Sequence, residues 1–293
     1  MIAVSIGEVL WDVLAGEYHL GGAPFNFAAH LRRLGHSVSF ISGVGSDPLG
    51  HQVRQEMVRL GLSSCFINEV LDHPTGRVTV TLEAAGQPRF VIHRPAAYDF
   101  LQLTREQLDL ISTQHPEWIY FGTLLQMNSS ARRVTDALLA SLPGAKRFYD
   151  VNLRPGSYTP ELVHDLLSKA TVIKLNDQEV VEVAKIIGCS YRSLEDFCRQ
   201  SARAFRYHAV CVTRGAEGCA TLIADDYLET SGYAVEVSDT VGAGDAFAAA
   251  FLHGLASGWR PSKVADFANR LGALVASRPG AIPDWDLTEV NSL

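Results

Sequence analysis

The chain has 293 residues, of which 47% are hydrophobic, and a formal net charge of -7. This length and apolar content suffice for one large α/β unit, and we expect residues 1–293 to form a single domain. An acidic chain in which no Lys/Arg run exceeds two residues is a poor match for nucleic acid. No apolar run reaches the roughly 18 residues of a membrane span, and the N-terminus carries no basic leader, so we expect a cytoplasmic protein with no membrane partner.

Several common site motifs are absent from the sequence. The five cysteines form no C-x-x-C pair and no H-E-x-x-H occurs, which argues against a disulfide framework or a structural zinc site. There is no G-x-x-x-x-G-K-[ST] loop and no H-R-D loop either. Any phosphoryl-transfer chemistry must therefore use other groups.

Short apolar stretches alternate with helical stretches along the chain. Strands are expected at Ile2–Ile6, Val38–Ser42, Trp118–Gly122, Arg147–Val151, Thr171–Leu175, Ala209–Thr213 and Ala220–Ile223. Helices are expected at Phe27–Leu34, Gly50–Leu60, Glu106–Ser112, Ala131–Ser141, Pro160–Ser168 and Leu194–Phe205. This order predicts an α/β fold, with a doubly wound, mostly parallel sheet flanked by helices and ligands at the carboxyl ends of its strands.

Two segments interrupt the alternation. Residues 13–20 (Val13–Leu20) are short and extended, and residues 76–94 (Gly76–Arg94) alternate as a hairpin that turns at Ala85-Gly86-Gln87-Pro88. No helix separates the two halves of the hairpin, so we expect a small antiparallel sheet, either a structural flap or a lid over a substrate. One apolar face of the hairpin is a candidate contact for a homodimer: Val78, Val80 and Leu82.

Two glycine-rich segments precede helices. Gly21-Gly22-Ala23-Pro24-Phe25-Asn26 is either a turn with Asn26 as a helix N-cap or a place where a ligand approaches the backbone and Asn26 binds a polyol. Gly43–Gly50 is a second such turn, and it lacks the third glycine of a dinucleotide-binding fingerprint.

Three further polar segments follow predicted strands. Asp150-Val151-Asn152-Leu153-Arg154 places polar groups on alternate residues, so we expect them on one side, with Arg154 as a phosphate ligand or a salt-bridge partner. Asn176-Asp177-Gln178-Glu179 is either a helix cap or a water-mediated magnesium site. The glycines of Thr213–Gly218 leave room for a nucleotide.

The most informative segment is Asp239–Phe247. Gly242, Ala243 and Gly244 are small, so their consecutive backbone N–H groups can approach an anion, and we call them the anion nest. Apolar residues then recur at helical spacing, which predicts a helix of about four turns whose positive end faces that anion. Asp245 in the first turn is either a carboxylate favoured by the helix dipole or a general base beside a phosphoryl group.

In order along essentially the whole chain, these motifs resemble those of the ribokinase-like, or phosphofructokinase B-type, carbohydrate kinases. The matching segments are Gly7-Glu8, Gly21–Asn26, Gly43–Gly50, Asp150–Arg154, Asn176-x-x-Glu179, Thr213–Gly218, Asp239–Phe247 and Arg278–Pro283. The resemblance implies a ribokinase-like fold and ATP-dependent phosphorylation of the primary hydroxyl of a sugar. It also implies Asp245 as the base, the anion nest around the transferred phosphoryl group, and Arg154 near the phosphates and the acceptor.

The resemblance assigns further residues to the ligands. Those implied for the sugar are Asp12, Gly22, Asn26 and Arg94, with residues 13–20 and 76–94 as the lid. Those implied for ATP are Asn176 and Glu179, with Glu179 holding Mg²⁺ through water, then Thr213, Gly215 and Gly218, with Asn269 beside the adenine. Those implied for a K⁺-type ion are Asp239, the carbonyls of Val241 and Gly280, and Asp284, which stands where other members often have serine.

The opening Gly7-Glu8, together with Gly-Gly-Ala-Pro-x-Asn, resembles the fructokinase branch, so fructose is the expected acceptor. Ribose, 2-keto-3-deoxygluconate and adenosine stay open as alternatives. A free sugar is expected rather than a sugar phosphate, because the acceptor-side segments up to Arg94 carry few cations. A catalytically silent nucleotide-binding sensor with the same fold is the rival interpretation, and the intact Asp245 argues against it.

Overall fold

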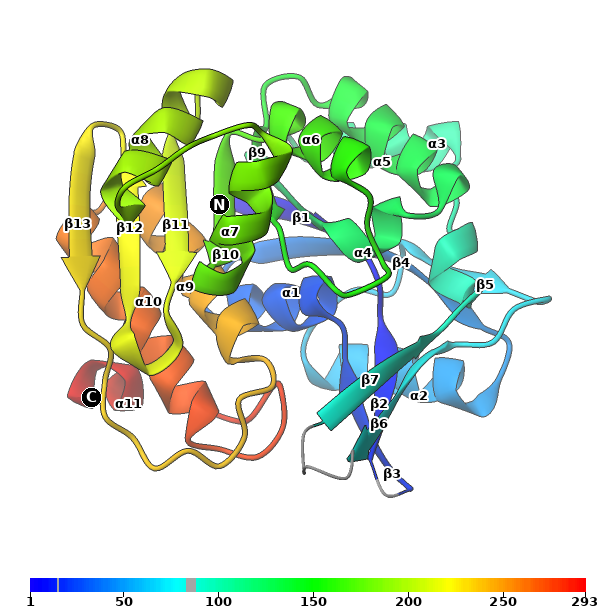
Figure 1. Ribbon diagram of the computed structural model, residues 1–293. Coiled ribbons are helices and arrows are strands. Elements are labelled where there is room, and N and C mark those ends of the chain that lie inside the picture. The colour runs from blue at the N-terminus through cyan, green and yellow to red at the C-terminus, as the bar shows by residue number, and fades with distance from the viewer. Residues whose placement is uncertain (15, 83–87) are drawn as a thin grey trace.

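A computed structural model describes residues 1–14, 16–82 and 88–293 of the protein (Figure 1). Within these ranges, the large sheet has the order β13-β12-β11-β10-β9-β8-β1-β4-β5. Its strands are β1 (Ile2–Ile6), β4 (Ser37–Gly45), β5 (Ile67–Val70), β8 (Trp118–Gly122), β9 (Lys146–Asp150), β10 (Val172–Asn176), β11 (Ala209–Thr213), β12 (Cys219–Ile223) and β13 (Asp226–Thr230). Neighbours from β11 to β5 pair in parallel, whereas β12 and β13 are antiparallel to their neighbours.

These pairings confirm the predicted α/β fold with a mostly parallel sheet. The predicted strand Ala220–Ile223 is part of β12, so it lies in the antiparallel edge and not in the parallel core. The strands β5 and β13 were not predicted, because each is short and contains adjacent polar residues that break the apolar pattern. The turn expected at Gly43–Gly50 begins later, because β4 continues to Gly45 and Asp47 caps the next helix.

Helices cover both faces of the large sheet. Their bounds are α1 (Ala23–Arg33), α2 (Pro48–Arg59), α3 (Arg105–Thr113), α4 (Thr123–Gln126), α5 (Ser129–Ser141), α6 (Pro160–Lys169), α7 (Asp177–Ile186), α8 (Leu194–Phe205), α9 (Ala243–Ala256), α10 (Pro261–Ala276) and α11 (Leu287–Ser292), with 3₁₀ turns η1 (Ala97–Phe100) and η2 (Gly215–Glu217). In Figure 1, α7 and α8 lie in front of the sheet, and α9 and α10 lie behind it.

The strand residues alternate between two hydrophobic cores, one on each face. Ala3 and Tyr120 pack into one core with α1, α9 and α10, whereas Val4 and Ile119 pack into the other. Side chains along a strand point to opposite faces, so an apolar strand buried on both sides supplies both cores. On the α1 side, Phe27 stacks on the Tyr120 ring, with ring centroids 3.7 Å apart.

A second, smaller sheet has the order β3-β2-β6-β7. Its strands are β2 (Leu10–Leu14), β3 (Glu17–Gly21), β6 (Gly76–Leu82) and β7 (Pro88–His93). It projects from the large sheet at the lower right of Figure 1. The predicted hairpin is present, although β2 pairs with β6 in parallel, so this sheet is mixed and not purely antiparallel. Most of the predicted turn, residues 85–87, lies outside the described residues, as does residue 15.

The inner face of the small sheet is packed against the body of the protein. Val78 is buried and packs with Leu10 and Leu124. The expectation that Val78 contributes to a subunit contact is therefore wrong, since the side chain points inward. Tyr18 and Val91 are 48% and 40% exposed.

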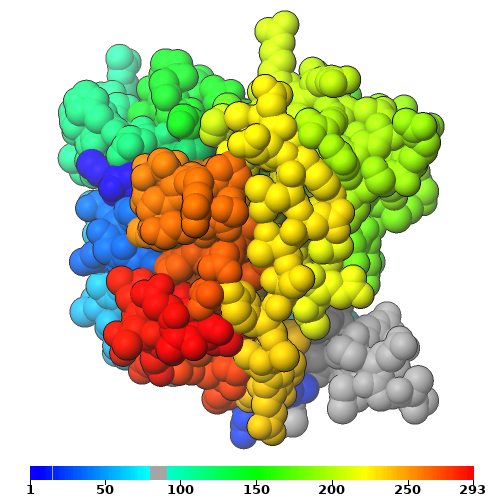
Figure 2. Space-filling model, turned by 90° about the vertical axis from the view of Figure 1, so that its left-hand side faces the viewer, coloured from blue at the N-terminus to red at the C-terminus, as the bar shows by residue number. Residues whose placement is uncertain are grey.

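The C-terminal helices lie beside β13, the strand at the other edge of the large sheet. Figure 2 views the molecule from this side, where the yellow β13 lies beside the orange and red helices α10 and α11. Helix α10 covers one face of the antiparallel strands β12 and β13. The carboxyl ends of the parallel strands stay open between the two sheets.

Candidate active site

A cavity of about 370 Å³ lies at the carboxyl ends of the parallel strands, between the large and the small sheet. Small-molecule sites typically have volumes of roughly 300–1,000 Å³. The sequence-predicted residues that line it are Asp12, Gly22, Asn26, Arg154, Asn176, Glu179, Thr213, Val241, Gly242, Gly244 and Asp245. Those outside its lining are Arg94, Gly215, Gly218, Asp239, Ala243, Asn269, Gly280 and Asp284. One cavity thus gathers motifs spread over most of the chain.

The anion nest lies at the start of α9, and the predicted helix of about four turns is present. Gly242 is its N-cap, with φ of 77°. An alanine Cβ at this position would lie 2.4 Å from the backbone oxygen of Ala281, so only glycine fits both the left-handed backbone and the close contact. Gly242 and Gly244 of the nest line the cavity at the N-terminus of this helix of 14 residues, whereas the Ala243 N–H donates to the Thr240 carbonyl over 3.3 Å.

The Ala281 backbone that packs on Gly242 is held by α1. The buried His30 lies with Nε2 at 3.0 Å from the Ala281 oxygen, and the Trp285 indole N–H donates to His30 Nδ1 over 3.1 Å. These two contacts fix the proton on Nε2 of a neutral ring. Burial lowers the pKa of His30 to about 4, so the ring stays neutral at physiological pH.

Asp245 lies in the first turn of α9, at the edge of the cavity. Its Oδ2 accepts a hydrogen bond of 2.8 Å from Nδ2 of Asn26. Burial, together with the neighbouring Asp150 carboxylate, raises the pKa of Asp245 to about 7. A carboxyl group with a pKa near the working pH can accept a proton from a hydroxyl group, so the geometry and the proton affinity both suit a general base.

The alternative role of Asn26 as an N-cap is wrong. The helix begins at Ala23 with Gly22 as its N-cap, which places Asn26 inside the first turns of α1. Gly22 has φ of 110°, and a Cβ there would lie 2.6 Å from the Glu8 oxygen, so glycine lets α1 start directly against the end of β1. This close approach brings Asn26 to Asp245, 219 residues away in the sequence.

A buried ion pair lies beside the anion nest and was missed by the sequence analysis. Lys174 Nζ lies 3.1 and 3.0 Å from the two carboxylate oxygens of Asp150, and the Tyr120 hydroxyl donates to Asp150 over 2.9 Å. An ideal Cβ at Gly244 would lie 3.5 Å from Lys174 Nζ, which places the ammonium group next to the nest. The available signal was a lysine within an otherwise apolar predicted strand.

Burial by itself lowers the pKa of Lys174, but the Asp150 and Asp245 carboxylates outweigh this effect and raise it, so the lysine stays charged. Lys174 and Asp150 are 7% and 1% exposed. The cavity therefore contains a fixed, desolvated cation close to backbone N–H donors, an arrangement that stabilises negative charge.

The segment Asp150–Arg154 does not continue the strand as expected. β9 ends at Asp150, and Asn152 has φ of 38°, so the backbone turns instead of alternating. Asp150, Asn152 and Arg154 nevertheless all line the cavity, because the turn brings them to it. Arg154 is exposed and lines the cavity, and its charge partly offsets the burial that raises the pKa of Glu8, Asp12 and Asp245.

Asn176 and Glu179 form a capping box at the start of α7. Asn176 Oδ1 accepts from the Glu179 N–H over 2.8 Å, and Glu179 Oε2 accepts from the Asn176 N–H over 2.8 Å. Glu179 Oε1 also accepts from the Leu153 N–H over 2.7 Å. Both residues also line the cavity. The two residues therefore cap α7 and, at the same time, place the Glu179 carboxylate at the cavity wall.

These oxygen atoms are the kind of donors that Mg²⁺ takes. Mg²⁺ usually keeps several waters and is bound through one or two carboxylates plus substrate phosphates. No group of three or more His, Cys, Asp or Glu side chains suited to a metal is found among the described residues. Glu179 at the cavity wall fits an ion held mainly through water and phosphate oxygens.

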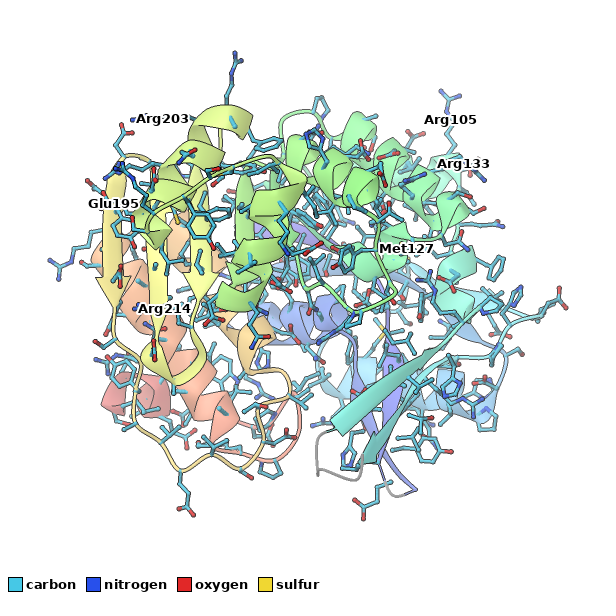
Figure 3. The ribbon with its side chains drawn as sticks, in the orientation of Figure 1. Arg105, Met127, Arg133, Glu195, Arg203 and Arg214 are labelled. Carbon is cyan, nitrogen blue, oxygen red and sulfur yellow. The ribbon has the colours of Figure 1, made fainter. Side chains whose placement is uncertain are left out.

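The Thr213–Gly218 turn connects β11 to β12 next to the cavity. Thr213 lines the cavity, whereas Arg214, labelled in Figure 3, places its guanidinium 2.8 Å from Glu229 of β13. Asn269 on α10 is buried, and its amide donates over 3.3 Å to the Ser231 carbonyl. Gly215, Gly218 and Asn269 do not line the cavity.

Of two residues predicted to bind the sugar, one lines the cavity and the other does not. Asp12 lines the cavity from β2, and burial raises its pKa to about 6. Arg94 does not line the cavity, because its guanidinium forms an ion pair with Asp99, a side chain that is 1% exposed. Arg94 also donates to the Leu124 oxygen over 3.1 Å. Its charge is thereby compensated within the protein.

The predicted monovalent-cation loop is only partly assembled. Asp239 accepts from the Val241 N–H over 3.0 Å and from the Gly280 N–H over 3.2 Å, so it ties the two loops together. The Asp284 carboxylate instead lies 2.8 Å from Arg33 and its side chain is 90% exposed. Asp284 is thus an ion-pair partner of α1 and does not fit the role of a cation ligand.

The comparisons with known proteins agree with this arrangement. The pattern of the pfkB family carbohydrate kinases matches residues 3–287. The chain belongs to this family and is a sugar kinase, a phosphotransferase.

Relatives of known name are similar over most of their length. A fructokinase of Escherichia coli is 29% identical over 276 residues, which are 89% of this chain and 87% of that protein. The crystal structure of a fructokinase with bound ATP from Xylella fastidiosa has a TM-score of 0.88 at 25% identity, covering 99% of this chain and 97% of that one. A fructokinase double mutant from Vibrio cholerae O395, with fructose, ADP and potassium ion bound, has a TM-score of 0.82 at 25% identity, covering 99% and 97%.

No helix in the described ranges has the length and apolar character needed to cross a membrane.

Proposed function

We propose that the protein is an ATP-dependent kinase that phosphorylates a primary hydroxyl group of free fructose. The observation that carries this proposal is the position of Asp245. Its carboxylate lies at the start of α9 beside the anion nest, within a cavity that Asp12 and Asn26 also line. A base, an anion site and a polar wall for a small acceptor are the parts that phosphoryl transfer to an alcohol requires.

The residues divide the reaction between them. Asp245 takes the proton of the attacking hydroxyl, and the anion nest and Lys174 hold the negative charge of the transferred phosphoryl group. Arg154, the remaining cation at the cavity wall, binds phosphate oxygens. Asp12, Gly22 and Asn26 bind the sugar hydroxyls. No covalent intermediate on the protein is needed, because positioning and charge stabilisation supply the catalysis.

ATP binds at the end of the cavity that Asn176 and Thr213 line. The Gly215–Gly218 turn and Asn269 lie beside the nucleotide there. Mg²⁺, held near Glu179 through water, neutralises charge on the phosphates when bound. A K⁺-type ion, when bound, would be held by the Val241 and Gly280 carbonyls and Asp239. The potassium-bound Vibrio fructokinase supports this ion.

The described residues form one domain in this proposal, and the small sheet is a lid. Val78 and Ile92 of this sheet line the cavity, so closure of the sheet excludes water from the acceptor. A homodimer through the lid uses its outer face, where Tyr18 and Val91 are partly exposed. Light scattering on the purified protein measures this assembly.

A sugar panel tests the proposed function. ATP consumption is measured with fructose, ribose, 2-keto-3-deoxygluconate and adenosine, in Mg²⁺ with and without K⁺. We expect the highest kcat/KM for fructose, and faster turnover with K⁺ than without it. A higher kcat/KM for another acceptor corrects the substrate, and no turnover with any of them favours the silent sensor.

A further inference from the structure

The Asp47 carboxylate ties the small sheet to the body of the protein at a point outside the cavity. Its Oδ2 accepts from the Thr75 N–H over 2.8 Å, and its Oδ1 accepts from the Thr75 hydroxyl over 2.7 Å. The same Oδ1 accepts from the Gly50 N–H over 2.8 Å, which caps α2. One side chain thus holds both the start of a helix in the body and the residue that directly precedes β6. We call Asp47 and Thr75 the lid anchor.

The lid anchor also includes the end of β4 among its contacts. Thr75 is 1% exposed, and its Oγ1 accepts from the Gly45 N–H over 2.9 Å. A Cβ at Gly45 would lie 2.7 Å from the Thr75 nitrogen, and a Cβ at Gly50 would meet the Gly45 oxygen. Three segments therefore meet so closely around one carboxylate that none of them can shift without the others.

The Asp47 carboxylate stays ionised in this cluster. Burial by itself raises the pKa of Asp47, but the hydrogen bonds from Thr75 and Gly50 outweigh this effect and lower it. An ionised carboxylate carries only acceptor atoms, so both of its oxygens can face donors at once. Hydrogen bonds to a charged group are stronger than those between neutral groups. The lid anchor is therefore intact at neutral pH.

The chain enters β6 through a narrow gap directly after the lid anchor. A Cβ at Gly76 would lie 2.7 Å from the Tyr98 ring and 2.9 Å from the Val9 oxygen. The preceding residue but one, Pro74, accepts a hydrogen bond of 2.8 Å from the Ala97 N–H. These contacts leave little freedom to the backbone, so the direction of β6 is determined where it leaves the body.

That direction affects the cavity, although Asp47 and Thr75 do not line it. Val78 of β6 lines the cavity and is paired with Asp12 of β2, which also lines it. Because the two strands belong to one sheet, a rotation of β6 at Thr75 displaces both side chains together. A displacement of about 1 Å at a reacting site can lower the rate by about 10²-fold, even when its cause is distant.

We propose that Asp47, acting through Thr75, is a positioning residue that sets the orientation of β6 and thereby places the lid over the reacting groups. This inference rests on the proposed kinase function, in which the small sheet is the lid. It assigns a part in turnover to two residues that touch neither ATP nor the acceptor.

Asp47→Asn tests the carboxylate. The Asn amide has one acceptor oxygen, so it cannot serve the Gly50 N–H and the Thr75 N–H together. We expect kcat/KM for fructose to fall about 10- to 100-fold, with KM for ATP within about 2-fold of the wild type. Asp286→Asn is the matched control, because Asp286 caps α11 through the Glu289 N–H over 2.9 Å, and it should leave both values unchanged.

Two substitutions of Thr75 separate positioning from helix capping. Thr75→Val keeps the shape of the side chain and the cap of α2, but it removes the hydroxyl that joins Asp47 to Gly45. We expect kcat/KM for fructose to fall about 10-fold in this variant, because a buried N–H loses its acceptor and the lid loses its link. Thr75→Ser keeps the hydroxyl and should stay within about 3-fold of the wild type.

The products of ATP consumption give a measurement that a merely structural role would not change. When the lid is misplaced, water can attack the γ-phosphorus in place of the sugar. The bond to the bridging oxygen of the β-phosphate then breaks, ADP and inorganic phosphate form, and the proton of the water passes to Asp245. At saturating fructose, we expect the ratio of inorganic phosphate to sugar phosphate to rise at least about 5-fold in Asp47→Asn and Thr75→Val. Thr75→Ser and Asp286→Asn should keep the wild-type ratio.

Each outcome bears on the lid anchor or on the function beneath it. If the wild type phosphorylates a sugar but Asp47→Asn and Thr75→Val keep its kcat/KM, the positioning role is overturned. It is also overturned if urea midpoints fall in these variants while the product ratio stays at the wild-type value, since the contacts then serve stability alone. If another sugar of the panel is the better acceptor, that sugar replaces fructose in every comparison. If the wild type phosphorylates no sugar, the proposed function fails and the inference fails with it.

Discussion

The cavity has a transfer half, beside the anion nest and Lys174, and an acceptor half, lined by Glu8 and Asp12, and the two halves compensate buried charge differently. In the transfer half, the buried Asp150 carboxylate is matched by Lys174 and by the Tyr120 hydroxyl. In the acceptor half, Glu8 keeps a buried oxygen without a protein partner among the described residues. Asp245 lies where the halves meet. The difference indicates that the transfer half is preorganised by the protein, whereas the acceptor half is completed by its ligand.

The largest expected effect comes from the residue between the halves. Asp245→Asn keeps the size of the side chain but removes the base, so we expect kcat to fall by roughly 10²- to 10⁴-fold. ATP affinity should change by only a few fold, because the anion nest is untouched. Steady-state kinetics and ATP titration measure the two effects. The surface substitution Asp72→Asn is the control. A near-normal kcat in Asp245→Asn would show that Asp245 is not the general base.

Lys174→Met tests whether the transfer half depends on its internal charge pair. It leaves the Asp150 carboxylate buried without its cation, and we expect the free energy of unfolding to fall by about 3–5 kcal/mol. Urea denaturation measures this loss. Adding Asp150→Asn should recover most of the stability but not the activity, because the cation beside the nest is still absent. An unchanged midpoint in Lys174→Met would mean that the pair is dispensable.

Gly242→Ala tests the shape of the anion nest, with Gly258→Ala as the matched control. Both glycines have positive φ, but a Cβ at Gly258 has no atom within 4 Å, whereas one at Gly242 meets Ala281. We expect Gly258→Ala to cost about 1 kcal/mol of stability with normal kcat. Gly242→Ala should destabilise more and lower kcat at least about 10-fold. Equal effects on kcat in both variants contradict a nest shaped by the Ala281 contact.

The last prediction concerns the pH dependence of stability in the acceptor half. Burial raises the pKa of Glu8 from an ordinary 4.5 to about 7, so between these values the folded protein holds a proton that the unfolded chain releases. Stability contributed by Glu8 therefore falls as pH rises through this window. Relative to the wild type, Glu8→Gln should gain on the order of 3 kcal/mol between about pH 4.5 and 7.5. Urea midpoints at several pH values measure the difference.

Comparing the two proteins isolates Glu8 from other titrating groups. His30, whose pKa is lowered to about 4 by burial, acts in the opposite sense, because the unfolded chain takes up a proton there as pH falls. That contribution is common to the wild type and the variant and cancels in the difference. A pH-independent difference would mean that Glu8 is not protonated at neutral pH.

Much of the fold was predictable because its signals are local. Apolar strands between helical stretches predicted the parallel sheet, and the observed β1, β8 and β11 have the predicted bounds. The predicted strand-end motifs meet in one cavity because carboxyl ends of parallel strands lie at one edge. The parallel pairing of β2 with β6 was not predictable, because it depends on contacts distant in the sequence.

The parts of the site that sequence reasoning missed are pairings across elements. Lys174 looked like one residue of an ordinary strand, and its significance depends on Asp150 from the neighbouring strand. Asn26 was read as a possible cap, because a local pattern cannot report its contact with Asp245. Asp284 was placed by position along the chain, and Arg33 of α1 determines where its carboxylate lies.

The contacts of α1 also constrain when the site forms. Asn26 and His30, one turn apart on this early helix, bind Asp245 and Ala281, which lie 219 and 251 residues later in the chain. During synthesis, Asn26 is made early, and almost the whole chain must follow before its partner Asp245 is available. Contacts between such distant residues form slowly. Catalytic competence therefore requires nearly the whole chain, so chains that end before α9 cannot carry out this reaction.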